Sequence, residues 1–272
     1  MKKWHLFALI AVAIFSMTIF AGCGAENKDA SAGKNSLKVG VTPGPHAEVM
    51  EVVQKVAAND GLKIEIIEFS DYIQPNVALN QGEIDVNSYQ HQPFLDAQVK
   101  DRGYKIETLA KTILFPMGVY SKQLTAIDQI ADGAVVAIPN DPSNGGRALN
   151  ILEKAGLIKL RQDAGLSATA ADIAENPKHI VVRELEAAQI PLSLTDVSLA
   201  VINTNYAVSA GLVPTKDALF LEGTDSPYAN ILVVRTADKD GEAYQKLVKA
   251  YHSDEVKQFV NAHFAGSGIA TW

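Results

Sequence analysis

The sequence of 272 residues is poor in metal-binding and cross-linking side chains, with one cysteine and six histidines. A disulfide scaffold needs paired cysteines, and a structural zinc site usually needs several thiolates or clustered histidines. The histidines are scattered along the chain, so that neither arrangement is available. The sequence therefore excludes a disulfide-stapled scaffold and predicts no metal site.

Concentrated positive charge is also missing, because the formal charge is −7 and the lysines and arginines form no cluster. Nucleic-acid binding needs a basic surface that neutralises phosphates, so we expect no nucleic-acid partner. Hydrophobic residues make up 47% of the chain and charged residues 20%, enough for a real core. The length suits one large domain or two of roughly 100 to 150 residues.

Catalytic signatures are absent as well. No Gly-x-Ser-x-Gly nucleophile elbow and no His-Glu-x-x-His metal motif occurs. Pairs of acidic residues such as Glu65 and Glu68 fit a solvated face better than acid-base chemistry. The sequence predicts a protein that is not an enzyme and that carries no cofactor.

The N-terminus has the pattern of a targeting segment. Lys2 and Lys3 precede an uncharged, largely apolar stretch over residues 4–22, and the next charge is Glu26. This is typical of a secretory signal peptide, here residues 1–22. Residues 19–23 resemble the lipobox of bacterial lipoproteins, which predicts lipidation of Cys23; an uncleaved membrane anchor is the alternative. Residues 23–36 lack apolar periodicity and indicate a flexible tether.

The rest of the chain alternates strand-like and helix-like patterns. Short apolar runs predict strands at residues 37–41, 63–69, 84–86, 106–110, 134–138, 180–182, 199–202 and 231–235. Helical patterns cover residues 46–58, a helix from Gln74 to before Gly82, and residues 93–100, 147–155, 169–175 and 244–251. Helical crossovers connect parallel neighbours, so we expect an α/β fold with largely parallel sheets.

Ligand sites in such sheets lie at the carboxyl ends of the strands. The loops there with unusual polar and aromatic residues are 71–72, 87–93, 115–116, 139–147, 203–206 and 228–230.

Several motifs carry a resemblance to a known family. The stretches at residues 84–95, 139–147, 200–207 and 226–230, together with the terminal Trp272, resemble the methionine-binding lipoproteins of the NlpA family. The likeness runs from the lipobox to the last residue. It implies a two-lobe periplasmic-binding-protein fold of type II-like topology, with two interlobe crossings. Lobe one would comprise residues 37–117 plus 228–272, and lobe two residues 118–227.

Four polar residues are the expected contacts for an amino-acid head group. The guanidinium of Arg147, at the start of its predicted helix, suits bidentate capture of a carboxylate. A surface ion pair with Asp141 or Glu153 is the alternative. Asn144 is either a helix cap or a ligand contact. Asn203 and Asn230 flank apolar strands, where asparagines in turns are common. The resemblance implies that both contact the ligand, which amides can do as donors and acceptors; Asn205 is a weaker candidate.

The expected apolar wall consists of Tyr72, Tyr89, His91 and Phe115, where His91 enters only through the motif. A thioether gains roughly 0.3 to 1.5 kcal/mol from each sulfur-aromatic contact, although ordinary core packing explains such aromatics equally well.

The resemblance implies an extracytoplasmic, membrane-anchored lipoprotein that faces the periplasm or cell exterior. Such a protein captures methionine, as the L- or the D-enantiomer, and delivers it to an ABC transporter permease. A methionine-containing dipeptide or another apolar amino acid is the alternative ligand. A hydrolase and an adhesive surface lipoprotein are the alternatives from other classes.

Overall fold

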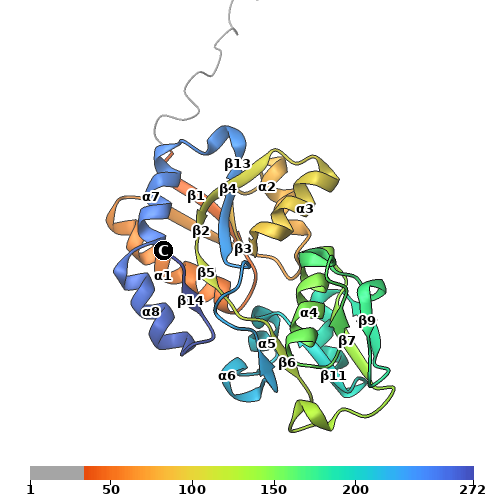
Figure 1. Ribbon diagram of the computed structural model, residues 1–272. Coiled ribbons are helices and arrows are strands. Elements are labelled where there is room, and N and C mark those ends of the chain that lie inside the picture. Colours follow the sequence, from red (N-terminus) through yellow and green to blue (C-terminus); the bar gives the residue numbers. More distant parts are fainter. Residues whose placement is uncertain (1–33) are drawn as a thin grey trace, which may run out of the picture.

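The computed structural model describes residues 34–272, which form two five-stranded sheets joined by two connecting segments (Figure 1). The predicted signal peptide, Cys23 and most of the predicted tether lie outside the described residues. The first strand begins at Ser36, one residue before its predicted start. Within residues 34–272, no helix combines the length and the apolar run that crossing a bilayer requires.

The first sheet has the strand order β2-β1-β3-β13-β4. Its strands are β1 (Ser36–Val41), β2 (Lys63–Glu68), β3 (Val86–His91), β4 (Ile106–Lys111) and β13 (Asn230–Arg235). On one face pack α1 (Pro45–Asn59), α7 (Glu242–Tyr251) and α8 (Asp254–Phe264), and on the other α2 (Gln74–Gln81) and α3 (Gln92–Arg102) (Figure 1). The sheet is thus covered on both sides, and its central strands β3 and β13 are almost completely buried.

The second sheet has the order β10-β7-β11-β6-β12. Its strands are β6 (Gly118–Tyr120), β7 (Val135–Pro139), β10 (Val181–Leu185), β11 (Leu199–Ile202) and β12 (Phe220–Leu221). Helix α4 (Pro142–Lys154) packs on one face, and α5 (Thr204–Ser209) with the 3₁₀ segment η4 (Ala187–Thr195) on the other. The remaining elements are β5 (Ile113–Leu114), β8 (Lys159–Leu160), β9 (Ile173–Glu175), α6 (Pro214–Asp217), β14 (Ile269–Ala270) and the 3₁₀ turns η1 (Ile127–Gln129), η2 (Gly165–Ser167), η3 (Ala170–Asp172) and η5 (Thr236–Asp238).

The two sheets share one strand arrangement. Four strands of each run in one direction, and one strand, β13 in the first sheet and β6 in the second, is antiparallel to both neighbours. Each reversed strand is the first that the chain reaches in its sheet after it leaves the other sheet, through residues 112–117, which include β5, or through residues 222–229. The predicted α/β class is confirmed, and the exception to parallel pairing occurs where a connecting segment replaces a helical crossover.

Strand β3 differs from its prediction. The short apolar run predicts a strand at residues 84–86, whereas the observed strand begins at Val86. The mostly polar residues 87–91 are predicted to be a loop, and they form the rest of the strand. All six residues of β3 are buried in the middle of the sheet. The side-chain amides of Asn87 and Gln90 hydrogen-bond to each other and to Asn76 on α2. This pairing removes the cost of burying unsatisfied amides.

Helix α4 begins five residues earlier than predicted, so that Arg147 lies in its second turn. Asp141 caps the helix by accepting the N–H of Asn144 at 2.9 Å, and Pro142 occupies the first turn. Gly146 lies inside the helix at a position where a Cβ would come within 2.9 Å of Ala168 N. The glycines that indicate a loop in sequence therefore mark a close approach of two backbones.

The helix predicted over residues 169–175 is wrong. Asp172 accepts the backbone N–H and the hydroxyl of Thr169, which closes a single 3₁₀ turn, η3. The following residues pair with β8 as strand β9. Helix α8, in contrast, forms where no helix is predicted; Ser253 caps it.

Candidate ligand-binding site

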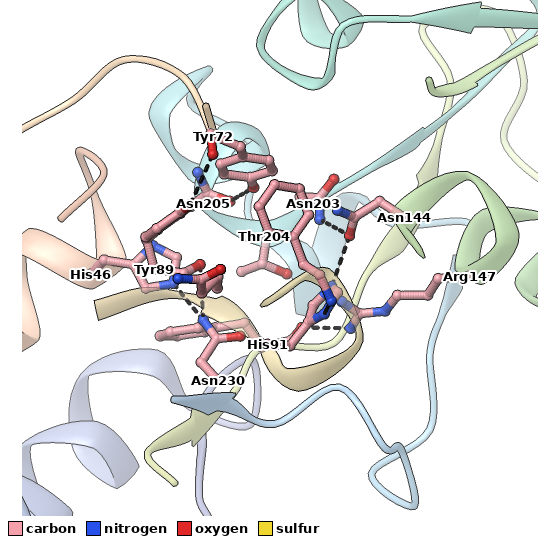
Figure 2. A pocket seen from close by; sticks show the side chains of 13 residues that line it. His46, Tyr72, Tyr89, His91, Asn144, Arg147, Asn203, Thr204, Asn205 and Asn230 are labelled. Atoms are coloured by element: carbon pink, nitrogen blue, oxygen red, sulfur yellow. Dashed lines mark hydrogen bonds between the residues drawn. The ribbon is translucent and has the colours of Figure 1, made fainter. Parts of the chain in front are cut away.

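A pocket lies between the two sheets, at the carboxyl ends of β1, β3 and β11 (Figure 2). It is lined by His46, Tyr72, Tyr89, Gln90, His91, Phe94, Phe115, Asn144, Arg147, Asn203, Thr204, Asn205 and Asn230. The structure thus brings together all eight residues predicted for a ligand site, and also the weaker candidate Asn205. They come from both sheets and from the first connecting segment.

Four lining residues are not predicted as site residues: His46, Gln90, Phe94 and Thr204. A usable signal exists for two of them. His46 follows the carboxyl end of β1 and Thr204 follows that of β11, which is where ligand sites of α/β sheets lie. Gln90 and Phe94 have no signal of their own, although both fall in the motif at residues 84–95 and Gln90 also in the loop at residues 87–93.

Arg147 is buried and paired, but with neither partner that its sequence neighbourhood suggests. Its Nε lies 3.1 and 3.2 Å from the two carboxylate oxygens of Glu222, and its Nη2 also donates to Glu222. Both side chains are about 95% buried. The alternative, a surface pair with Asp141 or Glu153, does not form, since Glu222 arrives from the second connecting segment, 75 residues away.

Two further contacts fix the guanidinium of Arg147. Nη2 donates to the carbonyl of Phe115 at 3.0 Å. The Tyr228 ring lies 4.5 Å below the guanidinium carbon, a cation-π arrangement. Nε and Nη2 therefore serve the protein, and Arg147 still lines the pocket.

Asn144 organises two other polar side chains. His91 Nδ1 accepts the N–H of Phe94, so that Nε2 carries the proton and donates to Asn144 Oδ1 at 3.1 Å. Asn203 Nδ2 donates to the same oxygen at 2.9 Å. Asn144 Nδ2 donates to Asp141. The helix-cap interpretation of Asn144 is wrong, because Asp141 is the cap and the amide of Asn144 joins His91 to Asn203 (Figure 2).

This arrangement leaves one acceptor open. With its Nδ2 committed to Asn144, Asn203 keeps an Oδ1 that is buried and has no hydrogen-bond partner within residues 34–272. A buried unpaired carbonyl oxygen costs roughly 1 to 3 kcal/mol. A ligand that donates a hydrogen bond here would recover that cost.

His46 holds Asn230 on the opposite side of the pocket. Its Nε2 accepts from Asn230 Nδ2 at 2.7 Å, so that Nδ1 carries the proton and donates to Thr42 Oγ1 at 2.7 Å. Burial lowers the pKa of His46 to about 3, and burial together with the positive charge of Arg147 lowers the pKa of His91 to about 3. Both imidazoles are therefore neutral near pH 7.

Aromatic rings form the apolar side of the pocket. The Tyr72, Tyr89 and Phe94 rings lie 5.8 to 6.2 Å apart, centre to centre. The Phe115 ring packs edge-on against His46 at 5.2 Å. Burial raises the pKa of the Tyr72 and Tyr89 hydroxyls well above the usual value, which keeps them as neutral donors.

Direct hydrogen bonds join the two sides of the pocket. Tyr72 Oη donates to Asn205 Oδ1 at 2.5 Å, and Tyr206 Oη donates to the carbonyl of Ser70 at 3.2 Å. The Tyr72 and Tyr206 rings pack at 4.9 Å. These contacts bridge the two halves of the structure at and beside the pocket.

The chemistry of the lining suits binding. Of the described residues that line the pocket, Arg147 alone carries a fixed charge, and the remaining polar groups are neutral amides, hydroxyls and imidazoles. No group of three or more potential metal ligands occurs in the described part of the chain. Neutral donors and acceptors together with aromatic rings fit a small zwitterion with an apolar side chain.

Two α/β units with a shared internal pocket define a two-lobe binding protein. The family model for NlpA lipoprotein matches residues 37–272. The chain therefore belongs to the NlpA lipoprotein family.

Similar proteins agree with this assignment. The chain is 48% identical over 273 residues to the D-methionine-binding lipoprotein MetQ of Salmonella typhimurium, a match that covers 99% of each chain. A nutrient binding protein from Burkholderia cenocepacia, solved bound to methionine, is 54% identical with a TM-score of 0.85. The match covers 87% of this chain and 100% of that protein. A periplasmic substrate-binding protein of an ABC transporter from Coxiella burnetii is 49% identical with a TM-score of 0.83, matched over 86% of this chain and 100% of its own.

Proposed function

We propose that this protein captures methionine in the pocket between its sheets and delivers it to an ABC transporter, while lipid on Cys23 holds it to a membrane on the extracytoplasmic side. The relatives support the ligand, since one is named for D-methionine and another was solved with methionine bound. The Coxiella burnetii protein supports the transporter.

The open acceptor on Asn203 is the observation that carries the proposal. An α-ammonium group is a strong donor, and its hydrogen bond to Oδ1 would satisfy an oxygen that is otherwise buried without a partner. The amide of Asn144 fixes the orientation of this oxygen. A carboxylic acid without an ammonium group would leave it unpaired.

Arg147 supplies the complementary contact for the ligand carboxylate. Nε and Nη2 bind Glu222 and Phe115, which leaves the Nη1 side for the ligand. A hydrogen bond to a charged partner contributes roughly 1.5 to 3 kcal/mol. Asn230, held by His46, is the proposed second polar contact.

The aromatic side receives the thioether. Tyr72, Tyr89 and Phe94 surround the apolar end of the pocket, and each sulfur-aromatic contact contributes roughly 0.3 to 1.5 kcal/mol.

The two sheets are the proposed lobes, residues 37–117 plus 228–272 and residues 118–227. Closure of such lobes about two connecting segments hides the ligand and creates the shape that a transporter recognises. The hydrogen bonds of Tyr72 and Tyr206 across the pocket support a closed form held by direct contacts.

Thermal unfolding against a ligand panel tests the proposal. Protein freed of ligand by unfolding and refolding is melted with L-methionine, D-methionine, leucine and a methionine dipeptide. A bound ligand stabilises by about 2.7 kcal/mol at a hundredfold excess over Kd. We expect methionine to raise the melting temperature most. A dipeptide that stabilises while methionine does not would contradict the proposal.

A further inference from the structure

Glu222 does not line the pocket, yet its carboxylate meets three segments of the chain. It binds Arg147 on α4, accepts the N–H of Met117 at 3.1 Å, and accepts the hydroxyl of Ser226 at 3.0 Å. Its own N–H donates to the carbonyl of Met117 at 2.9 Å. Both connecting segments and the second sheet therefore converge on one buried carboxylate.

This carboxylate determines which side of Arg147 is available. It engages Nε and Nη2 together, the side-on geometry in which one edge of the guanidinium is fully used. Phe115 and Tyr228 restrict the plane of the group further. An arginine so fixed presents a set direction to the pocket without loss of side-chain entropy on binding.

The carboxylate also determines the charge that a ligand meets. A buried Arg147 alone would attract any anion, because charges interact strongly where water is excluded. Arg147 is instead half of an ion pair with Glu222 that has no net charge, and both side chains are about 95% buried. The guanidinium then acts on a ligand carboxylate chiefly as a directed hydrogen-bond donor.

We infer that Glu222 is a positioning residue that makes the pocket selective for zwitterions over simple carboxylates. The inference rests on the proposed function, in which Arg147 meets the α-carboxylate of an amino acid. A zwitterion brings no net charge into a neutral site. An anion without an ammonium group brings an uncompensated charge and leaves Asn203 Oδ1 unpaired.

The test compares two ligands in Glu222→Gln. One is methionine, and the other is its desamino analogue, in which hydrogen replaces the α-ammonium. Glutamine has the same shape and still accepts hydrogen bonds from Arg147 and Met117, but the site gains one positive charge. The extra positive charge attracts the carboxylate of methionine but repels its ammonium group, so the two effects offset each other. The analogue has no ammonium group, so it experiences only the added attraction. We expect calorimetry to show the preference for methionine over the analogue reduced by about tenfold.

Controls separate charge from structure. Glu184→Gln removes an exposed carboxylate of β10 and should leave the preference unchanged. Glu222→Asp keeps the charge but shortens the side chain, so that affinity for both ligands should fall while the preference stays within about threefold of the wild type. This second variant also serves if Glu222→Gln does not fold, which circular dichroism would reveal.

The outcomes distinguish the inference from the proposed function. A folded Glu222→Gln protein with unchanged preference overturns the inference, and so does a tenfold loss of preference in Glu222→Asp. Wild-type protein that binds no methionine overturns the proposed function itself.

Discussion

The hydroxyl of Tyr72 donates a 2.5 Å hydrogen bond to Oδ1 of Asn205, a residue 133 positions further along the chain. Tyr72 precedes α2 beside the first sheet, and Asn205 lies on α5 beside the second. Both line the pocket, and Asn205 Nδ2 also reaches Thr42 Oγ1 at 3.4 Å. The contact therefore joins the two sides of the pocket directly.

Removal of this hydroxyl should speed ligand release. Tyr72→Phe keeps the ring contacts but leaves Asn205 Oδ1 unpaired, at a cost of about 1 kcal/mol or more. We expect labelled methionine to dissociate about five- to tenfold faster. Tyr104→Phe, outside the pocket, is the matched control. Equal release rates in Tyr72→Phe and wild type would show that this contact does not hold the pocket closed.

Arg147→Gln should lose most methionine binding. The substitution removes the proposed carboxylate donor and leaves Glu222 buried without its cation. Truncating one member of such a pair typically costs roughly 2 to 5 kcal/mol, or at least about thirtyfold in Kd. Calorimetry with methionine measures the loss, and Arg183→Gln, an exposed arginine of β10, controls for the change in net charge. An affinity like that of wild type in Arg147→Gln would remove the residue from the site.

Backbone contact rather than side-chain chemistry explains Gly146. A Cβ at this position would meet the backbone of Leu166 and Ala168, neither of which can move away as a flexible side chain could. Gly146→Ala should lower the free energy of unfolding by about 1 to 3 kcal/mol, as overpacking does. A Cβ at Gly223 meets nothing within 4 Å, so that Gly223→Ala is the control. Urea denaturation compares the two, and equal stability would contradict the close packing of α4 against η2.

The neutral histidines should make stability depend on pH. The folded-state pKa of His46 and of His91 is lowered to about 3 from an ordinary value of 6.5. Between these values the unfolded chain binds more protons, so that stability is complete above pH 6.5 and falls as the pH drops toward 3. Each histidine should cost about 2 kcal/mol between pH 6.5 and pH 5.

Denaturation at pH 7 and pH 5 measures this dependence. His46→Gln should lose about 2 kcal/mol less than wild type over that interval, because one of the two protonations no longer occurs. Wild type and His46→Gln with equal losses would contradict the burial of a neutral imidazole at this position.

The sequence predicted the elements whose pattern is local. Alternation of apolar residues located β1, an isoleucine-rich run located β2, and Pro75 with Gly82 located both ends of α2. The sequence did not predict the elements whose conformation depends on contacts with distant parts of the chain. Asn87 and Gln90 can be buried in strand β3 because Asn76 satisfies their amides, and a glycine is needed at position 146 because α4 approaches the backbone of Leu166.

The site divides in the same way. The eight predicted residues converge on the pocket because they follow strand ends or belong to the family motifs. The partner of Arg147 could not be predicted, since Glu222 is one acidic residue among many and only the return of the second connecting segment brings it to α4. Likewise, the interaction of Asn144 with His91 and Asn203 depends on three elements that sequence distance does not relate.

Native mass spectrometry of the protein purified without denaturation tests the central claim most directly. A ligand enclosed by direct contacts across the pocket should survive purification, and its release by unfolding permits identification by mass and by chiral chromatography. The account predicts methionine at up to one molecule per chain in wild type, and its loss in Arg147→Gln. A peptide or another amino acid in place of methionine, or methionine retained equally by Arg147→Gln, would contradict the account.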